Sequence, residues 1–202
     1  MSRSTGWTLA VLAVAAALVV GLLAQLRHDP PASRVPGAAA GQDLTALRER
    51  AGLPACAAGA PGTGPVALRQ VSVECAADGA PVQVAEMFAG RRVVVNLWAY
   101  WCGPCRDELP ALAEYQRRAG PGVTVVTVHQ DDNEAAALAL LVELGVRLPT
   151  LQDGRRQIAA ALRVPNVMPA TVLLAADGSV ARILPQPFAT AEAIATAVEE
   201  AL

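Results

Sequence analysis

The sequence predicts an α/β domain with a central mixed sheet and helices on both of its faces. Two apolar runs rich in β-branched residues, Arg92–Ala99 and Val123–Val128, are each followed by a longer segment of helical character. Alternation of strands and helices is typical of parallel strands covered by helices. An Asp177–Gly178 pair between two short apolar runs predicts a hairpin, which makes the sheet mixed.

Short elements are expected before the first central strand. Residues Leu44–Ala51 are compatible with a short helix, and Ala67–Glu74 alternates between apolar and polar side chains as an edge strand does. The segment Val84–Phe88 is long enough for one helical turn before Gly90. The following run, Arg92–Ala99, is almost continuously apolar, which indicates a central strand covered on both faces.

Two longer helices are expected after the two central strands. The first is predicted over Cys102–Arg118, with a kink at Pro110 because proline removes a hydrogen bond inside a helix. The second is predicted to begin after residues 131–133, whose Asp and Asn side chains suit an N-cap, and to end near Leu144. Gly145 then suits its C-terminal cap.

The remaining elements are expected to be short and bounded by turn or cap residues. Thr190 is the predicted N-cap of the last helix. These elements are Thr150–Asp153 (strand or loop), Gln157–Leu162 (helix), Thr171–Ala175 and Val180–Leu184 (the hairpin strands) and Thr190–Ala201 (final helix).

The N-terminal segment Trp7–Leu26 contains no charged residue, and about 20 residues of helix span a bilayer core. A cleaved signal peptide is the alternative, but its apolar region is shorter and its cleavage site has small residues, unlike Ala24–Leu26. We therefore expect a transmembrane anchor at residues 7–26. The expected organisation has a short cytoplasmic segment at 1–6, the anchor, a Pro/Ala/Gly-rich linker at 27–55 and a folded domain at 56–202.

Composition restricts the class of partner. The formal net charge is −2, so no nucleic acid or other polyanion is implied. Aromatic residues make up 3% of the chain, so the core must be built mainly from Val, Leu and Ala.

The chemistry is predicted at residues 101–105, Trp-Cys-Gly-Pro-Cys. Cysteines at this spacing close and reopen a small disulfide, which suits redox exchange better than structural bridging. The pair lies where a strand ends and a helix begins. Unsatisfied N–H groups at a helix N-terminus favour a thiolate at Cys102 over one at an ordinary position.

Cys56 and Cys75 flank a Pro/Gly-rich stretch and are expected to form a structural disulfide. Two unpaired buried thiols, or a second redox pair that relays electrons, are the alternatives. A zinc site is disfavoured because His28 and His129 are not at ligand spacing. A structural disulfide would place the folded domain outside the cytoplasm, with the N-terminus inside.

The order of elements together with the WCGPC motif resembles the thioredoxin fold. More narrowly, the chain resembles the membrane-anchored TlpA/ResA type of extracytoplasmic thiol–disulfide oxidoreductase. The resemblance covers about Val66–Leu202 and is most specific in VVVNLWAYWCGPCRDELP. The insert that carries Cys56 and Cys75 departs from the family pattern.

The resemblance implies that Cys102 is the exposed nucleophile and Cys105 the resolving cysteine, which attacks a mixed disulfide at Cys102. Three neighbours are expected to support the pair. Pro104 tunes the turn and the redox potential, Trp101 lines the docking surface, and Gly103 completes the motif.

A buried Asp of cytoplasmic thioredoxin is replaced here by Asn96, which cannot titrate. The ResA type instead has an active-site Glu three residues after the second cysteine, and Glu108 matches it. The resemblance therefore implies that Glu108 raises the pKa of the cysteines and assists proton transfer. The alternative is an exposed helix residue without a role.

Three further expectations concern the surroundings of the site. Met168–Pro169 matches the cis-proline loop of the fold, so we predict a cis peptide that leaves backbone groups free for an extended substrate and hinders metal binding. Trp98 is expected to pack beneath the helix, as an ordinary core residue would. His129 is expected to be a loop residue without a partner.

The resemblance implies a cofactor-free reductase of protein disulfides in cytochrome c maturation. Its substrates would be cysteine-containing proteins such as apocytochrome c, and a membrane thiol transporter of the CcdA type would supply electrons. An oxidase that introduces disulfides into secreted proteins is the alternative within the class. A copper-binding chaperone is disfavoured, because chaperones of this fold have cysteines three residues apart, whereas two residues separate Cys102 and Cys105 here. A peroxidase is disfavoured because it needs a Thr or Ser three residues before the reactive cysteine, and this chain has Ala99 there. The sequence leaves the direction, the potential, the substrate and the oligomeric state open.

Overall fold

A computed structural model describes residues 44–62 and 64–202 of the chain. From residue 93 onward the elements follow the predicted alternation of strands and helices. In chain order they are α2 (Thr45–Ala51), η1 (Val66–Leu68), β1 (Ser72–Cys75), β2 (Pro81–Gln83), α3 (Val84–Phe88), β3 (Val93–Trp98), α4 (Gly103–Ala119), η2 (Gly120–Gly122), β4 (Thr124–His129), α5 (Glu134–Leu144), β5 (Thr150–Gln152), α6 (Gln157–Ala161), β6 (Ala170–Leu174), β7 (Val180–Leu184) and α7 (Ala191–Glu199).

The strands of the described residues form one mixed sheet in the order β2-β1-β5-β4-β3-β6-β7. The strands β3, β4 and β5 are parallel to one another, and the other pairs are antiparallel. Every residue of β3 is buried, as its continuous apolar run predicts for a strand covered on both faces.

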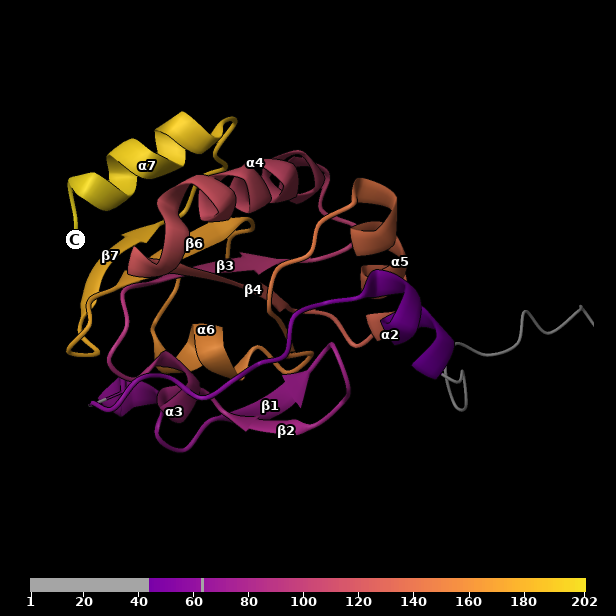
Figure 1. Cartoon of the computed structure of the whole chain (residues 1–202), viewed down its shortest axis with the longest axis horizontal. Helices are drawn as coiled ribbons and strands as arrows, with labels where there is room; N and C mark the ends of the chain where they lie inside the picture. Colours follow the sequence, from indigo (N-terminus) through magenta and orange to yellow (C-terminus); the bar gives the residue numbers. More distant parts are fainter. Residues whose placement is uncertain (1–43, 63) are drawn as a thin grey trace, which may run out of the picture. The chain divides into compact units, whose positions relative to one another are not determined.

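Helices cover both faces of the sheet, which confirms the predicted architecture (Figure 1). Because side chains alternate along a strand, Val94 and Trp98 of β3 face one apolar layer with α4, α5 and α7. Val93 and Val95 face the other layer, with α3 and α6. The position of each side chain at the carboxyl end of β3 is therefore set by this packing on two sides.

Local signals in the sequence explain where the elements begin and end. The Asn133 side chain accepts the N–H of Ala136 at 3.1 Å and begins α5, and Gly145 ends that helix with a φ of 64°. Thr190 caps α7 through the N–H of Ala193 at 3.2 Å. The predicted hairpin joins β6 to β7, and Gly178 has the positive φ of 83° that the turn requires.

The helix α4 is continuous through Pro110, which cannot donate a hydrogen bond to the carbonyl of Arg106. Its buried face, which includes Leu109 and Leu112, packs on the sheet. Packing of this face compensates for the missing bond because tertiary contacts supply most of the stability of a protein helix.

The predicted edge strand Ala67–Glu74 is wrong in two respects. Its first part is the turn η1, in which Leu68 donates to the carbonyl of Pro65 at 2.9 Å, and only Ser72–Cys75 is extended. The strand β1 is also not at the edge, because β2 lies outside it. The sequence did not indicate β2, which is three residues long and begins with a proline.

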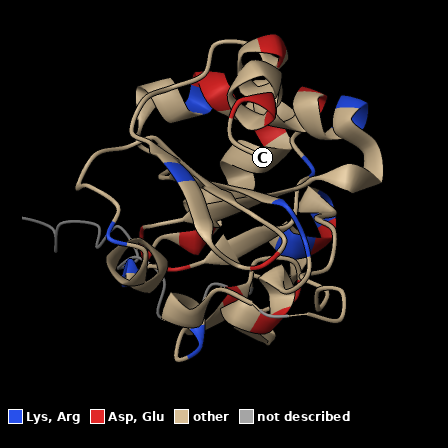
Figure 2. Cartoon of the chain, turned by 90° about the vertical axis from the view of Figure 1, so that its left-hand side faces the viewer, with Lys and Arg blue, Asp and Glu red and all other residues tan. Residues whose placement is uncertain are grey.

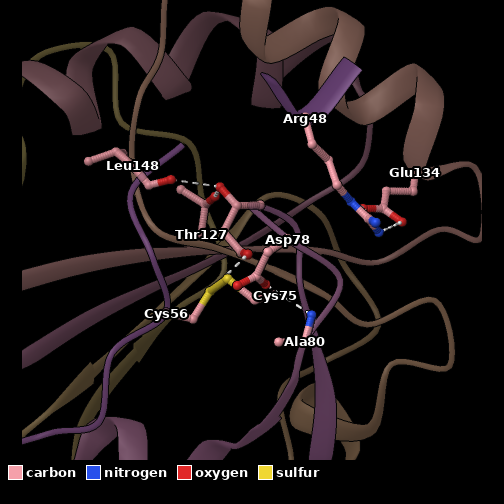
Figure 3. The surroundings of a disulfide bond; sticks show 9 residues. Arg48, Cys56, Cys75, Asp78, Ala80, Thr127, Glu134 and Leu148 are labelled. Carbon is pink, nitrogen blue, oxygen red and sulfur yellow. Dashed lines mark hydrogen bonds and ion pairs between the residues drawn. A yellow bond between two sulfur atoms is a disulfide. The ribbon is translucent and has the colours of Figure 1, made fainter. Parts of the chain in front are cut away.

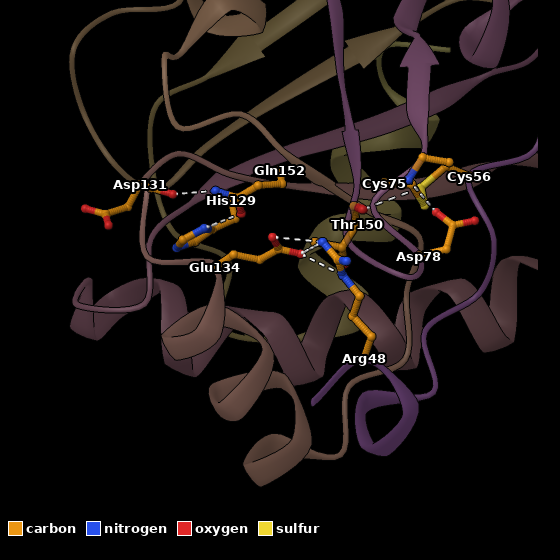
Figure 4. Close-up of polar contacts among 10 residues, drawn as sticks. Arg48, Cys56, Cys75, Asp78, His129, Asp131, Glu134, Thr150 and Gln152 are labelled. Carbon is orange, nitrogen blue, oxygen red and sulfur yellow. Dashed lines mark hydrogen bonds and ion pairs between the residues drawn. A yellow bond between two sulfur atoms is a disulfide. The ribbon is translucent and has the colours of Figure 1, made fainter. Parts of the chain in front are cut away.

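The folded part begins before residue 56, where the sequence suggested that the linker ends. The predicted short helix is present as α2, and Ala51 and Leu53 are buried in the core. Arg48 of α2 binds the carboxylate of Glu134 at the start of α5 at 3.0 Å (Figures 3 and 4). The predicted anchor at residues 7–26 lies outside the described residues, and within the described part no helix is long and apolar enough to span a bilayer.

Basic and acidic residues are interspersed along the ribbon in Figure 2. Arg182 of β7 and Glu200, for example, lie 3.2 Å apart and are both exposed. Exposed pairs of this kind contribute at most about 1 kcal/mol, so stability rests on the two apolar layers.

Cys56 and Cys75 are joined by a disulfide, and their Cα atoms are 5.8 Å apart (Figure 3). The loop between them lies directly against α3. Gly59 donates to the carbonyl of Glu86 at 2.9 Å, and a Cβ on Gly64 would lie 1.9 Å from the carbonyl oxygen of Ala85. The glycines of this loop therefore permit a backbone-to-backbone contact that no side chain would allow.

We expect the double variant Cys56→Ala/Cys75→Ala to have a free energy of unfolding about 3 kcal/mol lower, because the loop is then no longer closed in the unfolded chain. Denaturant unfolding of the oxidised proteins measures this difference. The variant should keep the reactivity of Cys102, so an unchanged stability or an inactive folded variant would contradict a purely structural disulfide.

Candidate active site

Cys102 and Cys105 lie at the N-terminus of α4, directly after the end of β3, and form a disulfide. Cys102 is the N-cap residue of the helix. Its Sγ accepts the backbone N–H of Cys105 at 3.3 Å, as the oxygen of a Ser N-cap would. Pro104 lies in the first turn, where its missing N–H costs nothing.

The two cysteines differ in exposure in the predicted order, but Cys102 is less exposed than expected. Cys102 is 6% exposed and Cys105 is fully buried. Gly103 and Pro104 are exposed beside them, and Trp101 is 59% exposed. The sulfur atom of a substrate protein would therefore reach Cys102 past these exposed residues of the same motif.

Glu108 is buried below the cysteine pair, which overturns the alternative of an exposed helix residue. It is 1% exposed, one turn beyond Cys105 on α4. One carboxylate oxygen accepts the Asn96 amide N–H at 3.0 Å, and the other accepts the backbone N–H of Phe188 at 3.2 Å. Burial raises the pKa of Glu108 to about 7, although the hydrogen bonds from Asn96 and Phe188 oppose this increase.

Asn96 is the buried partner that orients Glu108. It lies in β3 on the same face as Trp98, and its Nδ2 donates both to Glu108 and to the hydroxyl of Thr171 at 3.2 Å. Thr171 is directly opposite Asn96 in the β3–β6 pair. The Asn96 side chain thus joins the carboxylate on α4 to the strand that follows the proline loop.

The Met168–Pro169 peptide is cis, as predicted. Pro169 is buried and precedes β6, whose first residue Ala170 pairs with Leu97 of β3. Met168 packs against the apolar cluster that contains both cysteines. The proline loop therefore packs on the same apolar layer as the dithiol, and its Val167 is 39% exposed.

The two tryptophans have different environments. Trp98 is fully buried in the core beneath α4, as expected. Trp101 is exposed, and its indole Nε1 donates to the carboxylate of Asp131 at 3.0 Å. Burial opposes ionisation of Asp131, but hydrogen bonds from Asn133 and Trp101 lower its pKa overall.

The prediction for His129 is wrong. It is the last residue of β4, is fully buried, and its ring lies 4.8 Å from the ring of Trp98, centroid to centroid. Its Nδ1 is 2.8 Å from Oε1 of Gln152, and its Nε2 accepts the Tyr100 N–H at 3.4 Å. Burial lowers the pKa of His129, while Gln152 and Asp131 oppose this decrease.

Sequence reasoning missed Asp131, Gln152 and Thr171 as parts of the site. Asp131 was interpreted only as a helix-cap residue, and the other two gave no signal. They become neighbours through strand register, because His129 pairs with Trp98 on one side and with Gln152 on the other. Among the described residues, no group of three or more His, Cys, Asp or Glu side chains is placed to hold a metal ion.

A redox-active cysteine pair at the start of a helix, next to a central strand and a cis-proline loop, defines a thioredoxin-like protein. Residues 46–198 match the family model described as Redoxin. The chain belongs to the Redoxin family.

Named relatives agree with the expected resemblance. The chain is 29% identical over 108 residues to "Thiol-disulfide oxidoreductase ResA" of Bacillus subtilis, which covers 53% of this chain and 59% of the relative. It is 43% identical over 70 residues to a thioredoxin of Rhodospirillum rubrum, which covers 33% of this chain and 62% of the relative. The chain thus spans less than two thirds of these curated relatives.

Solved structures agree on the fold. The dsbF protein of Mycobacterium tuberculosis has a TM-score of 0.59 at 23% identity, covering 68% of this chain and 99% of that one. A secreted thiol-disulfide isomerase of Corynebacterium glutamicum has a TM-score of 0.57 at 25% identity, covering 64% of this chain and 81% of that one. The described domain therefore has a thioredoxin-like α/β fold.

The pKa of Glu108 gives a stability prediction. The folded state holds the Glu108 proton up to about pH 7, whereas the unfolded chain releases it near pH 4.5. The contribution of Glu108 to the free energy of unfolding is therefore fully present below pH 4.5. It is lost as the pH rises through 7, which lowers the free energy of unfolding by about 3 kcal/mol. We expect Glu108→Gln to remove this decrease in oxidised protein, measured by denaturant unfolding at pH 4.5 and pH 8.

The exposed neighbour Asp107 provides a matched control on the same helix turn, and Asp107→Asn should leave the pH dependence unchanged. In reduced protein, Glu108→Gln should also shift the pH profile of Cys102 and Cys105 alkylation to lower pH. If neither profile differs from that of the wild type, Glu108 has no electrostatic role in the site.

Proposed function

We propose that the chain is a thiol–disulfide oxidoreductase that exchanges electrons with cysteine pairs of other proteins. The observation that carries the proposal is the cysteine pair at the N-terminus of α4, where Cys102 Sγ accepts the N–H of Cys105. The same N–H and the helix dipole stabilise negative charge on Cys102 when the disulfide opens. The family and the names of the curated relatives support this class of reaction.

In the reducing direction, the Cys102 thiolate attacks one sulfur of a substrate disulfide. The substrate S–S bond breaks, a mixed disulfide forms, and the other substrate sulfur leaves as a thiolate that takes up a proton. Cys105 then gives its proton to the Glu108 carboxylate and attacks Cys102 Sγ. The second substrate sulfur leaves and is protonated, so the substrate gains two electrons and two protons while Cys102 and Cys105 become a disulfide.

The surroundings of the pair suit an extended, partly apolar protein segment. Trp101, next to Cys102, and Val167, two residues before Pro169, are large apolar side chains that remain exposed. The loop that ends at Pro169 supplies backbone groups beside the cysteines, so a substrate strand can form main-chain hydrogen bonds there.

The physiological role that we favour is reduction of protein disulfides outside the cytoplasm, in the maturation of c-type cytochromes. The match to a thiol-disulfide oxidoreductase named ResA supports the class of reaction. Within that class we propose apocytochrome c cysteines as the substrate and a CcdA-type membrane thiol transporter as the electron donor. An oxidase for secreted proteins is the alternative direction of the same chemistry.

The roles of the two cysteines predict different trapping behaviour. We expect Cys105→Ser to accumulate a mixed disulfide with a substrate protein, because no resolving thiol releases it, whereas Cys102→Ser should trap none. The wild type should reduce insulin disulfides in the presence of a small thiol. Equal trapping by both variants, seen on non-reducing gels, would contradict the assignment.

The reduction potential of the same purified protein against glutathione gives the direction. A value of about −270 mV is expected for a reductase, and a value of about −120 mV would identify an oxidase. The Cys56→Ala/Cys75→Ala variant is the control, since its only remaining cysteines are the pair being measured.

The proposed location predicts that the chain is an uncleaved membrane protein with its domain outside. Intact cells should show Cys102 alkylated by a membrane-impermeant maleimide after reduction, and the protein should remain in the membrane fraction at its full length. A shortened, released protein would instead indicate a cleaved signal peptide at Trp7–Leu26.

A further inference from the structure

Residues Ala99–Cys102 form the turn that delivers Cys102 to the start of α4. The N–H of Cys102 donates to the carbonyl of Ala99 at 3.0 Å, which closes the turn. The two residues inside it are Tyr100 and Trp101. Any group that holds these two residues therefore controls where Cys102 is placed.

Both inner residues of the turn are held by the end of β4 and the residues that follow it. The Tyr100 N–H donates to Nε2 of His129 at 3.4 Å, and the Trp101 indole donates to Asp131 at 3.0 Å. Gln152 of β5 forms hydrogen bonds with both His129 and Asp131. Its Oε1 lies 2.8 Å from His129 Nδ1, and its Nε2 donates to the Asp131 carbonyl at 2.6 Å (Figure 4).

These contacts define one tautomer of His129. The Gln152 Oε1 atom is an acceptor, so His129 Nδ1 carries the proton, and Nε2 has the lone pair that accepts from Tyr100. A neutral ring satisfies both partners. A protonated ring would present an Nε2–H to the Tyr100 N–H, and two donors cannot share a hydrogen bond.

We propose that His129 is a positioning residue of the dithiol site: its neutral ring holds the Ala99–Cys102 turn through Tyr100, and protonation of the ring releases that turn. The inference rests on the proposed thiol–disulfide exchange for its kinetic consequence alone. In acid, Cys102 then reacts more slowly than its thiolate fraction predicts.

The other charged or titratable groups around His129 do not replace the hydrogen bond from Tyr100, so this is the contact that protonation of the ring breaks. Asp131 acts on the ring from the following loop, and the Tyr100 ring lies 6.0 Å away. Directly after β5, the carboxylate of Asp153 accepts the N–H groups of Gln157 and Ile158. From α5, the carboxylate of Glu134 is bound by Arg48. Burial of the ring lowers its pKa, so His129 is neutral at pH 7 and charges only in acid.

The chain contains two histidines and two tyrosines, so selective labelling gives a direct test. Full-length protein in detergent, labelled with ¹⁵N in His and Tyr, should show the Nδ1–H tautomer for His129 at pH 7.5. On acidification, the Tyr100 amide should shift with the same midpoint as the His129 ring. The Tyr115 amide on α4 is the internal control and should not follow, and His28→Gln assigns the ring signals.

Kinetics provide the second readout, namely the rate at which reduced Cys102 reacts with an aromatic disulfide between pH 4.5 and pH 8. His129→Gln retains an acceptor that does not titrate, and His129→Phe retains a ring against Trp98 but no acceptor. At a pH below the His129 midpoint found in the spectra, the wild type should be about fivefold slower than His129→Gln after matching at pH 8, as expected for one lost hydrogen bond. His129→Phe should be slower at every pH.

The experiments distinguish failure of the positioning role of His129 from failure of the proposed thiol–disulfide exchange. An Nε2–H tautomer at pH 7.5, or a Tyr100 amide that ignores the His129 titration, would overturn the positioning role even in an active protein. A chain that exchanges no disulfide at any pH would overturn the proposed function, and the spectra would still decide the role of His129. If the variants fail to fold, the wild-type spectra alone decide it.

Discussion

Hydrogen bonding of β3 to β4 on one side and to β6 on the other determines which strand residues lie side by side around the cysteine pair. The parallel pairing places His129 beside Trp98, and the antiparallel pairing places Thr171 opposite Asn96. Because β3 is buried on both faces, a register shift would move its polar Asn96 into an apolar layer. The strand therefore has one acceptable register, and the ends of its neighbours form the site.

Burial acts on the two titratable residues of this region in opposite directions. It raises the pKa of Glu108 and lowers that of His129, because in both cases it disfavours the charged form. Below pH 7 Glu108 is largely protonated, and His129 remains neutral until the solution is more acidic. The interior beside the dithiol thus carries little charge below pH 7, and near neutral pH Glu108 can both accept and release a proton, as thiol exchange requires.

Local chemistry made much of this structure predictable. Continuous apolar runs identified β3 and β4, cap residues identified α5 and α7, and the family motif identified the cis Met168–Pro169 peptide. Contacts that depend on register were not predictable. Nothing near His129 in the chain indicates that Tyr100 and Gln152 are its partners, and the three-residue strand β2 is too short for a periodic pattern.

The same contacts bear on the direction of electron flow. A thiolate at Cys102 is stabilised by the start of α4, and stabilising the reduced form makes a pair more oxidising. Glu108 acts in the opposite sense, because above pH 7 its buried carboxylate disfavours a second negative charge at Cys105. The effect of Glu108 should dominate at neutral or higher pH, since low dielectric strengthens interactions between buried charges, whereas Cys102 keeps some contact with water. The proposed reducing direction therefore depends on Glu108, because its ionised carboxylate opposes the stabilisation of the reduced pair by the start of α4.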